Sequence, residues 1–350
     1  MQRSSVIRLL VSIFVCFSVL FYNFTGLIKP VKAVENNFLI PANDSVSRVK
    51  EKSQETQKNE TESKEEITSQ PENISSQSVT SLPVSAEDVV GKIIERYNSP
   101  YTAGSSYNKV YIKNSTGVNI DIKGLTESAL GFKIGADGTT PEVLIVHTHA
   151  TESFMETDAD YYTSSFKSRS QENEKNMVKI GAIVAQKLND AGIKTLHDVT
   201  LHDYPEYNGS YTRSAKTIKS YLSKYPTIKV VLDLHRDAVA SGQNDKVKLV
   251  TEIEGKKAAQ VMLVMGSNTG GITSFPNWQE NLKLAFKLQQ KLEEKYPTLA
   301  RPLLLRSRIY NQNLTTGSLL LEFGTDANSF DEVWYSAELV GNALTDVLKE

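Results

Sequence analysis

The stretch VLIVHTHATESF (Val143–Phe154) joins four apolar residues to His147 and His149, and a carboxylate follows three residues after the second histidine. The whole chain has only five histidines, so two of them directly after an apolar run call for an explanation. Such a run is typical of a strand buried on both faces, as in parallel sheets covered by helices. Ligand sites of α/β proteins collect where these strands end. The motif therefore predicts an α/β fold with a functional site at one edge of its sheet.

Strand and helix patterns alternate through the rest of the chain. Strands are expected in IKTLHD, IKVVLDLH, KVKLVTEI, AQVMLVMG, PLLLRSRI and SLLLEFG, and helices from near Asn173 to Gly192, across Tyr211–Tyr225, from Trp278 to Tyr296 and from Phe330 to Leu348. This alternation predicts a largely parallel sheet with helices on both faces. Upstream, AEDVVGKIIERY is expected to form a short helix, and KVYIKN and NIDIKG to form strands.

The composition limits the chemistry. Lys+Arg 39 against Asp+Glu 41 gives a formal charge of −2, and no nucleic-acid partner is expected because such domains carry a basic face. The only cysteine, Cys16, lies in the apolar N-terminal stretch, so the rest of the chain cannot form an intramolecular disulfide or a thiolate zinc cluster. A transition-metal site must therefore use imidazole and carboxylate ligands.

Three regions are predicted along the chain. Residues 1–33 form a transmembrane anchor or signal segment, because Leu9–Ile28 is apolar and of the length, about 20 residues, that spans a bilayer. A cleaved signal peptide ending at Ala33 is the alternative. Residues 34–85 are polar and predicted to be a disordered linker. Residues 86–350 form the folded domain, with its α/β core at about 142–350, and both readings of the N-terminus place that domain outside the cytoplasm.

Four side chains are predicted to meet at one rim of the sheet: His149, Glu174, His235 and Glu322. Two imidazoles and one carboxylate make a catalytic zinc site with its fourth position open to water. His149, Glu174 and His235 are the predicted Zn²⁺ ligands, with His147 as the alternative to His149. Glu322, on an apolar strand, is the predicted catalytic proton acceptor, since hydrolysis needs a second carboxylate.

Other readings of these residues remain open. A strand-end histidine can be a packing residue, and Glu174 at a helix start is favoured by the helix dipole without any metal. Asp233 is a candidate partner of His235, Arg236 and Asp237 can hold a substrate carboxylate or form an ion pair, and His197 and His202 are interpreted as loop residues. Ser153 permits a serine hydrolase, although no G-x-S-x-G motif is present. A non-catalytic wall-binding scaffold would keep the fold without this constellation.

The segments VLIVHTHATESF, VVLDLHRDAV and NLTTGSLLLEFGTDANSFDEVWYSAELVGNAL resemble the stage II sporulation protein P family. The domain is also similar to zinc-dependent N-acetylmuramoyl-L-alanine amidases. In those relatives a metal histidine follows the first strand, a metal glutamate begins the next helix, a second histidine ends a later strand, and the catalytic glutamate lies on a late strand. The resemblance implies His149, Glu174, His235 and Glu322 for these roles. The relatives' Gly-rich sequence around the first histidine is absent, so His147 and His149 both stay open.

The resemblance also implies a biological role. The family is associated with peptidoglycan hydrolysis during forespore engulfment, by amidase cleavage between N-acetylmuramic acid and L-alanine and by endopeptidase cleavage of peptide cross-links. Stage II sporulation proteins D and M are the expected partners. The expected location is the cell membrane, with a single span and the catalytic domain in the space between the mother cell and forespore membranes.

Overall fold

A computed structural model of the protein describes residues 88–350. The predicted anchor and linker, residues 1–33 and 34–85, lie outside the described residues. No helix within residues 88–350 has both the length and the apolar character needed to span a bilayer.

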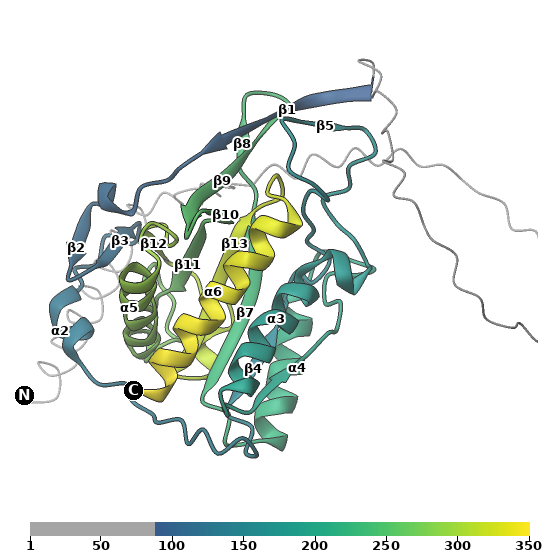
Figure 1. Ribbon diagram of the computed structural model, residues 1–350. Coiled ribbons are helices and arrows are strands. Elements are labelled where there is room, and N and C mark those ends of the chain that lie inside the picture. The colour runs from purple at the N-terminus through teal and green to yellow at the C-terminus, as the bar shows by residue number, and fades with distance from the viewer. Residues whose placement is uncertain (1–87) are drawn as a thin grey trace, which may run out of the picture. The chain divides into compact units, whose positions relative to one another are not determined.

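An eight-stranded sheet forms the centre of the domain (Figure 1), in the order β2-β3-β12-β11-β13-β7-β4-β6. Its strands are β2 (Ser105–Tyr107), β3 (Val110–Asn114), β12 (Leu303–Arg306), β11 (Val261–Gly266), β13 (Gly317–Thr325), β7 (Val230–Asp237), β4 (Val143–Val146) and β6 (Thr195–His197). Five of the seven neighbouring pairs are parallel, and β2–β3 and β11–β13 are antiparallel. The predicted α/β class is confirmed.

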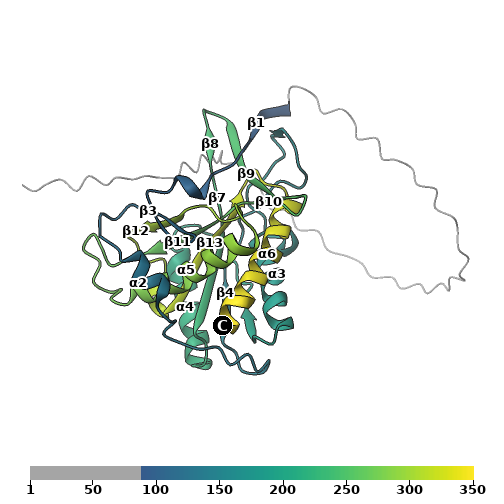
Figure 2. The ribbon, with the colours of Figure 1, turned by 60° about the vertical axis from the view of Figure 1, so that its left-hand side comes forward.

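Helices cover both faces of this sheet, and Figure 2 shows them from the side. They are α3 (Met177–Asp190), α5 (Trp278–Lys295) and α6 (Phe330–Lys349) on one face and α4 (Ser210–Lys224) on the other. Strand β4 separates the two cores by alternation: Val143 and Ile145 pack with α3, whereas Leu144 and Val146 pack with α4. All four side chains are buried, which explains why this strand is apolar at every position.

A second sheet contains β10-β9-β1-β5, with β8 pairing β9. Its strands are β1 (Val89–Arg96), β5 (Tyr161–Thr163), β8 (Ala240–Ser241), β9 (Asp245–Ile253) and β10 (Lys256–Ala259). The helix predicted in AEDVVGKIIERY is therefore wrong, because this segment is β1. Its apolar pairs, Val89-Val90 and Ile93-Ile94, have helical i, i+4 spacing, but parallel pairing with β9 and antiparallel pairing with β5 decide the conformation.

The strand predicted in NIDIKG is also wrong, because α2 (Ile122–Glu127) begins there. The side chain of Asp121 accepts a hydrogen bond from the backbone N–H of Gly124 at 2.8 Å, and this N-cap favours helix over strand. Three short 3-10 turns complete the element list: η2 (Pro100–Thr102), η3 (Asn173–Lys175) and η4 (Gln312–Leu314).

Helix α3 packs closely against the ends of β4 and β6 because residue 181 is a glycine. A Cβ atom built on Gly181 would lie 2.5 Å from Nε2 of His147 and 2.4 Å from Nε2 of His197. These two nitrogens are 2.9 Å apart, so the glycine leaves room for a histidine pair beneath the helix. The close approach places α3, and the loop before it, against the end of β4.

We expect Gly181→Ala to destabilise the protein even though alanine favours a helix by about 1 kcal/mol. The added methyl group overpacks the histidine pair, and such overpacking costs about 1–3 kcal/mol. Urea denaturation of the full chain should give a lower midpoint for this variant. Gly104→Ala is the control, because a Cβ there meets no atom within 4 Å. A midpoint for Gly181→Ala at or above that of the unsubstituted protein would contradict the packing described.

Candidate functional site

The register of the parallel strands β4, β7 and β13 determines which side chains meet at the site. His235 near the end of β7 is the partner of Glu322 on β13, and Asp233 is the partner of Val146, the last residue of β4. The chain leaving β4 therefore passes directly beside His235. The rings of His149 and His235 have centroids 5.3 Å apart and planes at 83°, and both residues are buried.

His149 is enclosed by the start of α4 and the loop before it. Its Nδ1 lies 3.4 Å from Oγ of Ser210. The ring of Tyr207 stacks on it at 4.5 Å and 10°, and Tyr211 meets it edge-on at 5.7 Å. Burial lowers the pKa of His149 to about 4, although the carboxylate of Glu152 opposes this shift. The imidazole is therefore neutral at pH 7, the form that binds metals.

His235 is held between carboxylates. Its Nδ1 faces Oε2 of Glu152 at 3.7 Å. Its Nε2 is 2.9 Å from Oδ1 of Asp233, but the approach lacks hydrogen-bond geometry and leaves Nε2 without a partner. Thr148 fixes Asp233 through its backbone N–H and its hydroxyl. Burial alone would lower the pKa of His235, yet the carboxylates of Asp233, Glu152 and Glu322 raise it to about 10. The surroundings of His235 thus favour a positive charge.

Glu152 is a buried carboxylate that was not among the predicted site residues. Its Oε2 accepts the backbone N–H of Arg236 at 3.1 Å, which turns the carboxylate toward Nδ1 of His235. Its Oε1 lies 3.9 Å from Nη2 of Arg169. The sequence held a signal, because Glu152 is the carboxylate three residues after His149 in the opening motif.

Glu174 lies elsewhere. It belongs to η3, its side chain is 77% exposed, and its carboxylate pairs with Nζ of Lys179 at 2.6 Å. The structure thus brings His149, His235 and Glu322 together but turns Glu174 toward solvent. The geometry favours Glu152 over Glu174 as the carboxylate beside the two imidazoles.

Glu322 is the carboxylate facing the imidazoles from β13. Its Oε2 is buried without a hydrogen-bond partner. Burial raises the pKa of Glu322 to about 8, although His235 acts in the opposite direction. Arg301 and Asp237, which form an ion pair with a distance of 2.8 Å between Nη1 and Oδ2, are charged neighbours of Glu322. A carboxyl group with a pKa near neutrality can both accept and release a proton in this range.

His147 is committed to other contacts. Its Nδ1 is 3.1 Å from the carbonyl oxygen of Leu234, and its Nε2 is 2.9 Å from Nε2 of His197. The ring of His202 is also occupied, with Nδ1 2.8 Å from the carbonyl oxygen of His147 and Nε2 2.9 Å from Oγ1 of Thr217. Both ring nitrogens of His147 are engaged, so the geometry favours His149 as the histidine available to a ligand.

Ser153 and Arg236 hold the loop that follows β4. The hydroxyl of Ser153 donates to the carbonyl oxygen of Lys175 at 2.5 Å, and not to His149. The guanidinium of Arg236 donates to the carbonyl oxygens of Ser153 and Ser168. These contacts give no support to a serine nucleophile or to Arg236 as a site for a substrate carboxylate.

The donors of the site determine which metal it can bind. Within residues 88–350, no group of three or more His, Cys, Asp or Glu side chains is already arranged as a metal site. His149, His235 and Glu152 nevertheless supply two imidazoles and a carboxylate from adjoining segments. Nδ1 of His235 faces Oε2 of Glu152, and the buried Oε2 of Glu322 has no hydrogen-bond partner. This donor set is that of a three-ligand zinc site.

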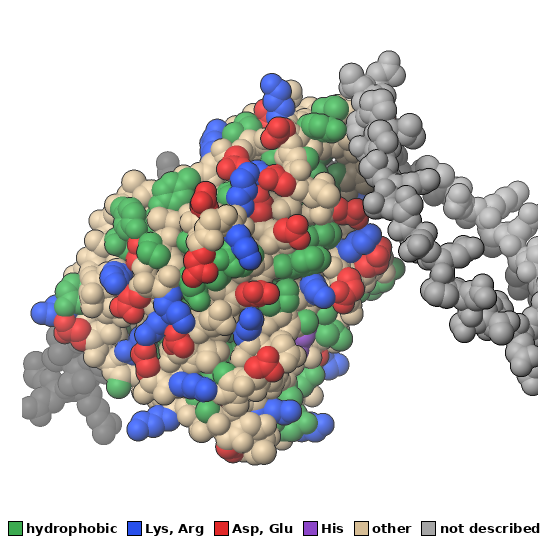
Figure 3. All heavy atoms as spheres, in the orientation of Figure 1, with side chains coloured by type: hydrophobic (Ala, Val, Ile, Leu, Met, Phe, Trp, Pro, Cys, Tyr) green, Lys and Arg blue, Asp and Glu red, His purple; other side chains and the backbone are tan. Residues whose placement is uncertain are grey.

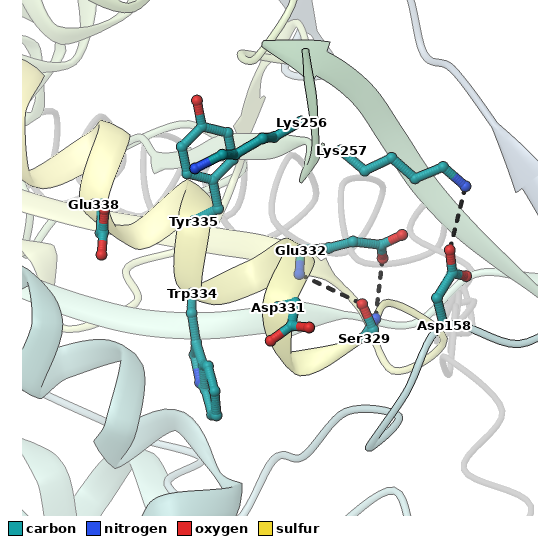
Figure 4. Close-up of a pocket in the computed structure, with 9 residues that line it drawn as sticks. All are labelled: Asp158, Lys256, Lys257, Ser329, Asp331, Glu332, Trp334, Tyr335 and Glu338. Atoms are coloured by element: carbon teal, nitrogen blue, oxygen red, sulfur yellow. Dashed lines mark hydrogen bonds and ion pairs between the residues drawn. The ribbon is translucent and has the colours of Figure 1, made fainter. Parts of the chain in front are cut away.

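A hollow on the surface of the domain lies apart from these residues. A cavity of about 540 Å³ lies beside the first half of α6 and β10 (Figure 4). Some of its charged groups have partners: Lys257 donates to Asp158 at 3.3 Å, and Ser329 and Glu332 form a capping box. It contains none of the histidines. On the face shown in Figure 3, acidic and basic side chains are intermixed.

Two solved structures are similar to this chain. N-acetylmuramyl-L-alanine amidase Ami1 from Mycobacterium abscessus matches with 12% identity and a TM-score of 0.34, over 59% of this chain and 97% of that chain. N-acetylmuramoyl-L-alanine amidase AmiC2 of Nostoc punctiforme matches with 11% identity and a TM-score of 0.34, over 59% of this chain and 94% of that chain.

Sequence comparison gives the family. The stage II sporulation protein P of Bacillus subtilis (strain 168) is 30% identical over 229 residues, which are 61% of this chain and 51% of that protein. The chain thus spans about half the length of this relative. The sequence model of the stage II sporulation protein P family matches residues 19–345, which is most of the chain. The protein belongs to the stage II sporulation protein P family.

Proposed function

We propose that the protein is a zinc-dependent peptidoglycan hydrolase. Its proposed reaction is N-acetylmuramoyl-L-alanine amidase cleavage, with endopeptidase cleavage of peptide cross-links as a second activity. The observation that carries the proposal is the convergence of His149, His235 and Glu152 beside the unpartnered carboxyl group of Glu322. Family membership supports a role in sporulation.

The donors fit zinc in composition and in surroundings. His149, His235 and Glu152 would hold the ion, and it would supply Lewis acidity, acidifying a water molecule and polarising a carbonyl oxygen. Metal-binding histidines usually place their other ring nitrogen against a carboxylate. His235 has this arrangement, because Nδ1 faces Glu152 while Nε2 lies 2.9 Å from Asp233.

Glu322 performs the proton transfers in this proposal. Its carboxylate takes a proton from the attacking water and delivers it to the leaving amide nitrogen. Burial suits this role, because it raises the pKa of Glu322 to about 8 and shields the transfer from bulk solvent. Hydrolysis of the muramoyl–alanine bond and of a peptide cross-link both break an amide. One proton shuttle can therefore serve both reactions.

The cellular setting belongs to the same proposal. Forespore engulfment, partnership with stage II sporulation proteins D and M, and a catalytic domain between the mother cell and forespore membranes follow from the family and the N-terminal sequence pattern. A wall-binding scaffold without catalysis is the second candidate. It has less support, because a scaffold has no need for an unpartnered buried Glu322 beside His235.

We expect Glu322→Gln to lose at least about 100-fold of the hydrolysis rate, since a positioned acid–base group contributes about 10²–10⁴-fold. Zinc content should be unchanged, because Glu322 is not a proposed ligand. The measurement is mass spectrometry of muropeptides released from purified peptidoglycan by the full chain, with and without a chelator. Unchanged activity in the variant would remove Glu322 from the mechanism, and wild-type protein that cleaves nothing with zinc present would favour the scaffold.

The same variant provides a check on the burial of Glu322 in chelated protein. Because the folded-state pKa is raised from 4.5 to about 8, the carboxyl group stabilises the fold fully only below its unfolded pKa. That stabilisation is lost as the pH rises toward 8. Thermal unfolding should therefore show Glu322→Gln gaining stability relative to the wild type between pH 5 and pH 8.

We expect Glu152→Gln to weaken zinc binding by more than about tenfold, because the loss of even an outer-shell metal partner has an effect of about 10–100-fold. Glu174→Gln is the matched control and should retain wild-type zinc affinity, since the Glu174 carboxylate is exposed and pairs with Lys179. The measurement is competition for zinc with a chromophoric chelator. The opposite ranking of the two variants would restore Glu174 as the ligand.

A further inference from the structure

Tyr211 lies against both imidazoles of the site but has no role in the function proposed so far. Its ring meets His149 edge-on at 5.7 Å and lies nearly parallel to His235, at 6.4 Å and 16°. The side-chain hydrogen bonds that reach Tyr211 from Asn311 and Ser214 end on its backbone carbonyl oxygen. Within residues 88–350 no side chain or backbone group hydrogen-bonds to the phenol hydroxyl, so it can bond a ligand.

The position of the ring is fixed by the local fold. Tyr211 is in the first turn of α4, whose N-cap Gly209 has φ 82°, a backbone conformation suited to glycine. Its neighbour Ser210 contacts His149, so this turn of the helix is tied to the site. On its other side the ring packs with Tyr310 at 6.1 Å. The phenol is thus presented by a regular element and not by a free loop.

Two phenols are neutral donors beside the imidazoles: Tyr207 stacks on His149, whereas Tyr211 lies against both rings. Attack of water on an amide places negative charge on the carbonyl oxygen, and a preorganised donor lowers that barrier. Glu152, Asp233 and Glu322 are carboxyl groups that surround the imidazoles with acceptors. A phenol is neutral at physiological pH and keeps its proton. Burial and the nearby carboxylates of Asp233 and Glu322 also raise the pKa of Tyr211 well above its usual range.

We propose that the hydroxyl of Tyr211 donates a hydrogen bond to the carbonyl oxygen of the scissile amide as negative charge develops on it. This inference rests on the proposed hydrolase function and assigns a further catalytic residue to that reaction. No covalent bond to Tyr211 forms, and the proton stays on the phenol. The stabilisation belongs to the transition state more than to the bound substrate, so it acts on kcat more than on KM.

The test is Tyr211→Phe in the full chain, which removes one oxygen atom and keeps the packed ring. We expect kcat on a soluble N-acetylmuramoyl-L-alanyl peptide to fall about 100–1000-fold, as for loss of one oxyanion donor, with KM, zinc content and thermal unfolding little changed. A second readout does not depend on turnover. A phosphinate analogue of the scissile amide should bind more weakly to the variant, whereas the free L-alanyl peptide product should bind equally to both proteins.

Tyr221→Phe is the matched control. Tyr221 lies on the same helix, but its hydroxyl is near Asp198 and its ring packs in the core between α4 and β4. This variant should keep wild-type kcat and phosphinate affinity. Wild-type kcat in Tyr211→Phe would reduce Tyr211 to a packing residue while leaving the hydrolase proposal intact. A wild-type protein with no zinc-dependent cleavage would overturn both.

Discussion

The site depends on the parallel alignment of β4, β7 and β13. Because these strands run in the same direction, their carboxyl ends meet at one edge and bring together side chains far apart in sequence. The pairing of Glu322 with His235 sets the carboxyl group beside the imidazole, and the exit of the chain from β4 sets His149 beside both. A shift of one residue in the pairing of β13 with β7, or of β7 with β4, would turn these side chains to the opposite face of the sheet.

Electrostatics explains why this edge is suited to a cation. Glu152, Asp233 and Glu322 are carboxyl groups in one small region, and burying such groups without compensation is costly. The neighbouring carboxylates raise the pKa of His235, whereas burial is the main cause of the raised pKa of Glu322. A proton on either group reduces the excess of negative charge. A bound divalent ion would serve the same purpose. In the proposed function, this cluster of buried carboxyl groups lowers the stability of the metal-free protein and favours binding of a cation.

The sequence predicted the parts of the site that lie on strands or just beyond their ends. His149, His235 and Glu322 were identified because an apolar strand gives its own end, and the α/β pattern then requires those ends to meet. Glu152 could not be chosen over Glu174 in this way. Its orientation depends on the backbone N–H of Arg236, 84 residues away in sequence, and no local pattern reports that contact. The segment forming β1 was mistaken for a helix for the same reason, since its partner β9 is distant in sequence.

In the proposed function, His149, His235 and Glu152 share one metal ion at the edge formed by β4, β7 and β13. The most direct measurement is a crystal structure of the zinc-loaded protein with anomalous data recorded at the zinc edge. We expect an anomalous peak about 2.0–2.2 Å from one nitrogen of each histidine and from a carboxylate oxygen of Glu152. A peak coordinated by Glu174 or by His147, or zinc found only at surface positions, would contradict it.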